Sequence, residues 1–142
     1  MQEKLIIWEP IKSYSNELHL VNILHENGLK IILEDEGGQT VTFHYDRYHN
    51  EPYILSYRVT DEFKRGDLLQ KITNAMNESH NPNRKWWTLF KVTNSNYVRW
   101  YDSLPGPGTD LDPHIEHHIY ICSEYTIDVM STYEPKVTVI KK

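Results

Sequence analysis

The stretch LKIILEDEGGQTVTFHY, residues 29–45, decides the fold. Apolar residues occupy alternate positions before Gly37 and Gly38, and the alternation resumes after the two glycines with Val41, Phe43 and Tyr45. Two alternating runs around a Gly-Gly turn are typical of a β-hairpin. The sequence therefore predicts a pair of antiparallel strands that present their apolar residues to a common core.

The rest of the chain is expected to extend this hairpin into a larger sheet. Short apolar or alternating runs, bounded by polar or Pro-containing loops, predict further strands at 53–59, 86–92, 117–122, 126–131 and 137–140. Consecutive strands joined by short links favour antiparallel pairing. The order of the strands within the sheet stays open.

Helical spacing predicts three helices. The first spans residues 14–27, with an apolar stripe through Leu18, Val21 and His25 and a C-terminal glycine, Gly28. The second begins near 60–62 and continues to Met76, and the third is a short helix after Asn94 or Ser95. We expect one α+β domain over residues 1–142, an antiparallel sheet of about five to seven strands with two to three helices packed on one face.

Composition excludes several classes of protein. The 142 residues carry 15 basic and 20 acidic side chains, so the net charge of −5 argues against binding a nucleic-acid backbone. No apolar run approaches the ~20 residues of a membrane span, and the first residues do not resemble a signal peptide. The single cysteine, Cys122, excludes an internal disulfide and a cysteine zinc site, which favours a reducing cytoplasm.

Residues 114–118, HIEHH, form the densest histidine cluster. Imidazole binds divalent transition metals, so His114, His117 and His118 are candidate metal ligands. On a strand, however, His118 and Glu116 share one face while His117 points to the other. The favoured interpretation is therefore a strand whose histidines face solvent, with a metal site or a small metal-dependent enzyme as the alternative.

No pattern predicts nucleophilic catalysis. The sequence contains no G-x-S-x-G motif, and Cys122 lies about 13 Å along the strand from His118, too far for a catalytic dyad. The carboxylate pairs stand side by side in sequence rather than across a groove, as glycoside hydrolysis needs. We therefore expect a non-enzymatic protein that requires no cofactor.

Aromatic and acidic residues favour protein binding. Ten Tyr and four Trp supply residues that commonly anchor interfaces. We expect a partner at three places, which are the hairpin acids, a strand-to-helix junction in which Arg58 could pair with a neighbouring acid, and the Pro- and Gly-rich loop 105–113. The candidate residues are Glu34, Asp35, Glu36, Arg58, Asp61, Glu62, Asp110 and Asp112.

Four segments resemble a group of small single-domain proteins from Bacillus and related Firmicutes. They are SYRVTDE at 56–62, LFKVTNSNYVRW at 89–100, HIYICSE at 118–124 and IDVMSTYEPKV at 127–137. Some members of the group look like immunity proteins encoded beside polymorphic or contact-dependent toxins. The resemblance implies a cytoplasmic protein that binds and blocks a toxin domain. A small-molecule binder with Trp86, Trp87 or Trp100 in its pocket is a further alternative.

Overall fold

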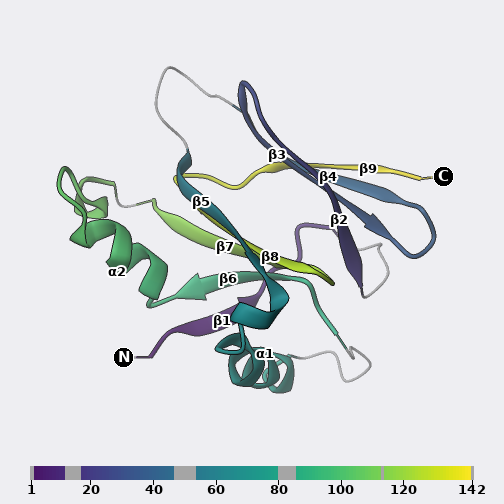
Figure 1. Cartoon of the computed structure of the whole chain (residues 1–142), viewed down its shortest axis with the longest axis horizontal. Coiled ribbons are helices and arrows are strands. Elements are labelled where there is room, and N and C mark those ends of the chain that lie inside the picture. The colour runs from purple at the N-terminus through teal and green to yellow at the C-terminus, as the bar shows by residue number, and fades with distance from the viewer. Residues whose placement is uncertain (1, 12–16, 47–53, 80–85, 113, 142) are drawn as a thin grey trace.

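The computed structural model describes residues 2–11, 17–46, 54–79, 86–112 and 114–141 (Figure 1). These residues form two antiparallel sheets. The five-stranded sheet has the order β1 (Lys4–Ile7), β6 (Leu89–Thr93), β7 (Glu116–Ile121), β8 (Tyr125–Ser131) and β5 (Ile54–Asp61). The four-stranded sheet has the order β2 (Leu18–His25), β3 (Gly28–Asp35), β4 (Thr40–Asp46) and β9 (Lys136–Ile140).

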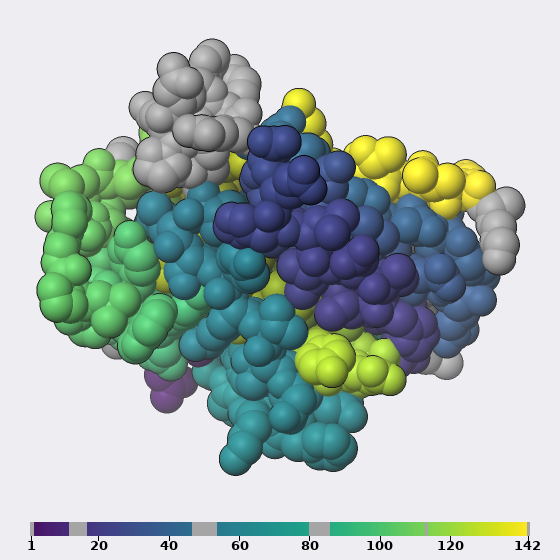
Figure 2. Space-filling view, turned by 45° about the horizontal axis from the view of Figure 1, so that its top comes forward, coloured from purple at the N-terminus to yellow at the C-terminus, as the bar shows by residue number. Residues whose placement is uncertain are grey.

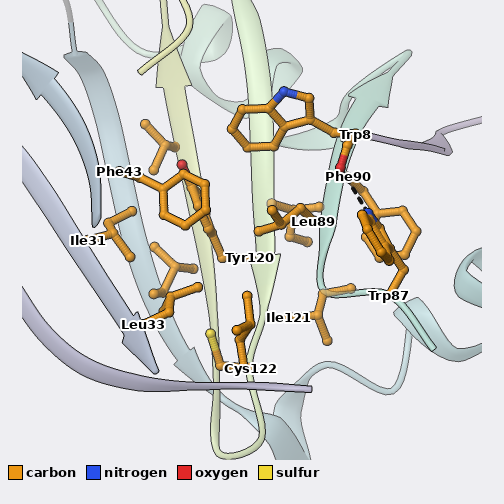
Figure 3. Packing of buried hydrophobic residues seen from close by; sticks show 14 of the residues in the cluster. Trp8, Ile31, Leu33, Phe43, Trp87, Leu89, Phe90, Tyr120, Ile121 and Cys122 are labelled. Carbon is orange, nitrogen blue, oxygen red and sulfur yellow. Dashed lines mark hydrogen bonds between the residues drawn. The ribbon is translucent and has the colours of Figure 1, made fainter. Parts of the chain in front are cut away.

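The two sheets face each other across an aromatic core. Phe43 of β4 meets Tyr120 of β7 edge to face, with ring centroids 5.0 Å apart, and Trp8 lies against both rings (Figure 3). The predicted hairpin is confirmed, because β3 and β4 pair with Leu33 opposite Val41 and Ile31 opposite Phe43, all fully buried. Its apolar faces therefore form one wall of this core.

Two helices cover the outer face of the five-stranded sheet. Helix α1 (Leu68–Asn77) contacts β1, and Tyr97 of α2 (Asn96–Ser103) lies against the ring of His117 on β7. In Figure 1 both helices lie on the side of this sheet away from β2, β3 and β4. The layers thus run from the four-stranded sheet through the five-stranded sheet to the helices. The prediction of an α+β fold built on antiparallel strands is confirmed, whereas the prediction of a single sheet of about five to seven strands was wrong, because the described residues form nine strands in two sheets.

The described residues of the segment 14–27 do not form the predicted helix. Residues 17–25 are extended and contain β2, and residues 14–16 lie outside the described residues. Strand β2 is an edge strand in which only Leu18 is buried, so its side chains carry no clear alternation. Without that alternation, the spacing of Leu18, Val21 and His25 matched a helix by chance. The main-chain pairing with β3 decides the conformation.

The second predicted helix is shorter than its sequence pattern. A 3₁₀ turn at Glu62–Lys64, capped by Asp61, comes first, and α1 begins only at Leu68. Of the two residues predicted to begin the third helix, Asn94 and Ser95, Ser95 is the cap, since its hydroxyl accepts a hydrogen bond from the amide of Val98. No helix among the described residues is long and apolar enough to span a membrane.

Gly28 links β2 to β3 in a conformation that other residues disfavour. Its φ is +110°, and a Cβ there would lie 2.1 Å from the carbonyl oxygen of Tyr45. We expect Gly28→Ala to lower the free energy of unfolding by at least about 2 kcal/mol, measured by urea denaturation. Gly66→Ala is the matched control, because a Cβ at Gly66 meets nothing within 4 Å. Equal stability of the two variants would contradict this.

Candidate functional site

The two adjacent histidines of β7 are both buried, on opposite faces of the five-stranded sheet. His117 reaches the helices, where it contacts Ser95 and Asp128, while His118 enters the core between the sheets. The expectation that these histidines face solvent was wrong. His114 precedes the strand and is exposed. The three candidate metal ligands are therefore not brought together, and the described residues contain no group of three such side chains that could hold a metal ion.

A buried carboxylate, Asp128, organises the outer face of the sheet. Arg58 lies directly opposite it on β5 and donates through Nε at 2.9 Å, and Arg65 donates through Nη1 at 2.7 Å. Nε2 of His117 donates to its other oxygen at 2.7 Å. Burial alone would raise the pKa of Asp128, but the hydrogen bond from His117 and the positive charges around it lower the pKa to about 2.

This cluster resembles a serine protease triad in composition but is built as a structural network. Nδ1 of His117 lies 2.7 Å from the hydroxyl of Ser95, so Ser, His and Asp form a chain. The ring is reversed relative to the usual triad, in which Nε2 faces the serine. Ser95 is only 7% exposed and its oxygen caps α2, while two arginines neutralise Asp128.

The second buried histidine belongs to an aromatic network. His118 stacks on Trp8 with centroids 4.7 Å apart and accepts a hydrogen bond from Tyr45, whose hydroxyl is 2.6 Å from that of Tyr120. Its Nε2 lies 2.8 Å from Oε1 of Glu116. These two residues therefore lie on the same face of the strand, as predicted. Burial lowers the pKa of His118, although the hydrogen bond to Glu116 opposes this effect. The lowered pKa favours the neutral form of the His118 ring in the folded protein at neutral pH.

The shifted pKa values of His118 and Asp128 predict that the free energy of unfolding decreases in acid. The pKa of His118 is lower in the folded protein than in the unfolded chain. As the pH drops below about 6.5, His118 is therefore protonated more readily in the unfolded chain, and the free energy of unfolding decreases. The contribution of Asp128, about 2 kcal/mol, is complete above the usual carboxyl pKa and is lost as the pH falls towards 2. We expect urea midpoints to decrease from pH 7 to pH 5 and again to pH 3. A constant midpoint would contradict the prediction.

The acidic candidate residues have different roles. Asp35 is buried and accepts hydrogen bonds from the amides of Gly37 and Gln39, so it shapes the β3–β4 turn, whereas Glu34 and Glu36 are exposed. Among the described residues, Arg58 does not pair with an acid close to it in the sequence, for which Asp61, Glu62 and the neighbours of Arg65 were the expected candidates. Arg58 pairs with Asp128, because β5 and β8 place those two residues opposite each other, and Asp61 caps the 3₁₀ turn instead.

A cleft opens beside α1 at the end of the sandwich where β7 turns into β8. Its volume is about 290 Å³, and the side chains of its floor are mostly apolar. We call it the α1 cleft and define it by its lining residues, which are Glu17, Glu62, Arg65, Leu68, Leu69, Ile72, Trp86, Ile121, Cys122, Ser123 and Thr126. Figure 2 shows the β7–β8 turn (lime) meeting the start of β2 (purple) and the α1 region (teal) at this end.

One large apolar side chain of the cleft lining is exposed, and a second exposed one is adjacent to a lining residue in the sequence. Phe63 is 88% exposed and follows Glu62 of the cleft rim, and Leu69, in the cleft lining, is 70% exposed. Leu69 lies on the outward side of α1, whereas Leu68 and Ile72 are buried. The i, i+4 spacing of Leu68 and Ile72 was the signal that could have identified Leu69 as an outward residue.

The remaining candidates lie at the other end of β7. Asp110, Asp112 and His114 precede that strand, and Figure 1 shows this loop beside α2, far from the β7–β8 turn. Asp110 is exposed, and Asp112 accepts the amide of His114. The structure thus places the junction at 61–62 beside the α1 cleft, which Glu62 lines. The pairing of Leu18 with Asp35 brings the hairpin acids to the same end of the sandwich. The described part of the loop 105–113 lies at the other end, apart from these two groups.

The three candidate tryptophans have separate environments. Trp86 lines the α1 cleft, Trp87 is buried and donates to the main-chain oxygen of Trp8, and Trp100 is half-exposed on α2. Only Trp86 can meet a ligand in the cleft.

Comparisons of this chain with protein-family models, with curated proteins and with solved structures found no match.

Proposed function

We propose that this chain is a non-enzymatic protein-binding domain, an immunity-type inhibitor that blocks a basic toxin domain in the cytoplasm. The observation that carries the proposal is the exposure of Leu69 in the lining of the α1 cleft, together with the exposure of Phe63, which follows the lining residue Glu62 in the sequence. Large apolar side chains gathered around a hollow are typical of interface anchors, while isolated ones are common on any surface. An inhibitor needs such a surface and a stable scaffold, but no reactive group.

The charge around the cleft suits a basic partner. Glu62 lines it, and Glu124 lies in the β7–β8 turn, where its main-chain oxygen accepts the amide of Glu62. The pairing of Leu18 with Asp35 places Glu36 near Glu17. Opposite charge accelerates the encounter of two proteins, and the net charge of −5 acts in the same direction.

The buried polar groups support a binding role over a catalytic one. Ser95, His117 and Asp128 have hydrogen-bond partners that occupy their reactive atoms, and all three lie beneath the helices. A catalytic site instead presents its reactive groups in an accessible pocket. The network of Ser95, His117 and Asp128 fixes the packing on the outer face of the sheet. Its residues take no part in the exposed surface that would contact a partner.

Capture from source cells that express the neighbouring genes tests the proposal. We expect the tagged wild-type chain to retain a basic polypeptide, and Leu69→Asp to reduce its recovery at least about tenfold, since an interface anchor contributes 2 kcal/mol or more. Mass spectrometry of the eluate measures the recovery. Co-expression of the chain should also protect cells from the retained polypeptide.

Leu111→Asp is the matched control for this experiment. Leu111 is 75% exposed, similar to Leu69, but lies in the loop before β7 at the other end of the sheet. The same polypeptide should be retained by this variant as by the wild type. Equal recovery with Leu69→Asp, or equal loss with both variants, would contradict a partner surface at the α1 cleft.

A further inference from the structure

We infer that an extended segment of another protein binds beside β9 and adds a strand to the four-stranded sheet. The segment carries compact apolar side chains at alternate positions, on the face that turns towards the five-stranded sheet. This binding goes beyond the proposed function, because it uses an edge of the four-stranded sheet and not the α1 cleft. Two features of the fold support it, the offset between the two sheets and the regular pairing of β9.

The two sheets are offset by one strand. The rings of His25 and Tyr57 stack and place β2 over β5, and the aromatic contact in the core places β4 over β7. Strand β9 lies over β6, because Glu134, just before β9, is 2.6 Å from the ammonium of Lys91 on β6. The four-stranded sheet therefore ends at β9, while the five-stranded sheet continues for one more strand, β1.

The described strands leave β1 uncovered on its inner face. Ile6 pairs with Lys91 on β6, and Lys91 pairs with His118 on β7, so these three side chains share the face that turns towards the core. Nevertheless, Ile6 is 46% exposed, whereas Leu5, on the opposite face where α1 packs, is buried. A strand added beside β9 would lie over Ile6 and remove its side chain from water.

Among the four edge strands, β9 is the best suited to receive a new neighbour. Strands β2 and β5 each have a register shift in their pairing, and such bulges hinder the addition of a strand. Strand β1 has only four residues and packs against α1. Strand β9 pairs with β4 without a shift, and no described strand lies on its other side (Figure 1). The main-chain groups on that side can therefore pair with an added strand.

A second copy of this chain does not fit beside β9. If the β9 strands of two copies paired, their five-stranded sheets would compete for the same space, because each of these sheets extends one strand beyond its own β9. A single extended segment has no second layer and avoids this conflict. The occupant is therefore one strand of a partner, held by main-chain hydrogen bonds and by its alternate apolar side chains.

Synthetic peptides test the inference on the full wild-type chain. Titration with acetyl-Glu-Val-Thr-Val-Thr-Val-Thr-amide, followed by ¹H–¹⁵N NMR, should give saturable shifts at the amides of Ile6, Val137 and Val139. The N–H groups of alternate residues in a strand point to opposite edges, so only the valines or only the threonines of the peptide donate to β9. Of two further peptides, N-methylated at all valines or at all threonines, one should bind and the other should not.

Three results of these titrations would overturn the inference. They are the absence of saturable shifts with the unmodified peptide, saturation at residues away from β9 and β1, and equal binding of the two N-methylated peptides. The last result would show that the peptide contacts the protein by its side chains alone and does not extend the sheet.

Ile6→Asp tests the contact with β1. We expect it to weaken binding of the unmodified peptide at least about fivefold, because the valines of the peptide would then face a carboxylate. Val59→Asp is the matched control, since Val59 is 43% exposed on β5 and should leave binding unchanged. Equal effects of the two variants would contradict a strand over β1. The comparison of the N-methylated peptides does not depend on the folding of either variant.

Two further measurements separate this surface from the alternatives. In sedimentation velocity, a dimer that the peptide dissociates would identify a second copy as the occupant and overturn the inference, whereas a monomer supports it. Leu69→Asp should bind the peptide as the wild type does, because Leu69 lines the α1 cleft. Loss of peptide binding in this variant would contradict a site beside β9. Loss of capture with intact peptide binding would support both proposals as separate surfaces.

Discussion

Asp128→Ala is expected to lower the free energy of unfolding by about 3–5 kcal/mol. The carboxylate is fully buried and neutralises Arg65, whose guanidinium is itself largely buried, while it also bonds Arg58 and His117. Its removal leaves those donors without their acceptor under the helices. The loss is large because buried charge remains behind, rather than because an ion pair is intrinsically strong. Urea denaturation followed by circular dichroism measures it.

Asp67→Ala is the matched control for this variant. Asp67 pairs with the same guanidinium at 3.1 Å, but its own side chain is half-exposed. We expect a change of at most about 1 kcal/mol, the range of solvent-exposed ion pairs. Asp128→Asn, which keeps the shape of the side chain, should fall between the two. If both alanine variants were equally stable, Asp128 would not be the organising group of the outer face.

Phe43→Ala is expected to destabilise the fold by about 3–5 kcal/mol as well. The ring is fully buried between the sheets and contacts both Tyr120 and Trp8, so its removal leaves a cavity that the two facing sheets close poorly. Thermal and urea unfolding should both report the loss. The cause here is lost packing, which makes the effect insensitive to salt.

Phe63→Ala removes the same ring from the surface. Because Phe63 is 88% exposed, its truncation should change stability by no more than about 0.5 kcal/mol. This contrast separates a packing role from a binding role for the two phenylalanines. A destabilisation of Phe63→Ala comparable to that of Phe43→Ala would contradict the exposed position and weaken the case for a partner surface at the α1 cleft.

Local signals in the sequence predicted local structure well. The β3–β4 hairpin follows from alternating apolar residues around a Gly-Gly turn, and a cap at Asn94 or Ser95 follows from polar side chains placed before a helical stripe. The edge strand β2 was misassigned because an edge strand needs no alternation, and Gly28 suits a hairpin turn as well as a helix terminus. Periodicity identifies an element only where one of its faces is consistently buried.

The candidate site depended on information that no local pattern contains. Arg58 and Asp128 are 70 positions apart and meet only because β5 is the neighbour of β8. The burial of His117 and His118 on both faces of β7 likewise required a second sheet on one side and helices on the other. The acidic candidates could be named from the sequence, but their distribution between the two ends of the sandwich depends on strand order.

The strand order also has a consequence for how the chain folds. Strands β2, β3 and β4 are consecutive hairpins that can pair as soon as they are synthesised, whereas β4 receives its second neighbour only when residues 136–140 arrive. The pairing of β1 with β6 closes a loop of comparable length. Such distant closures slow folding, because their entropy is lost before the contacts form. The nascent chain therefore holds an open β4 edge through most of its synthesis, and this interval is when it is most exposed to aggregation.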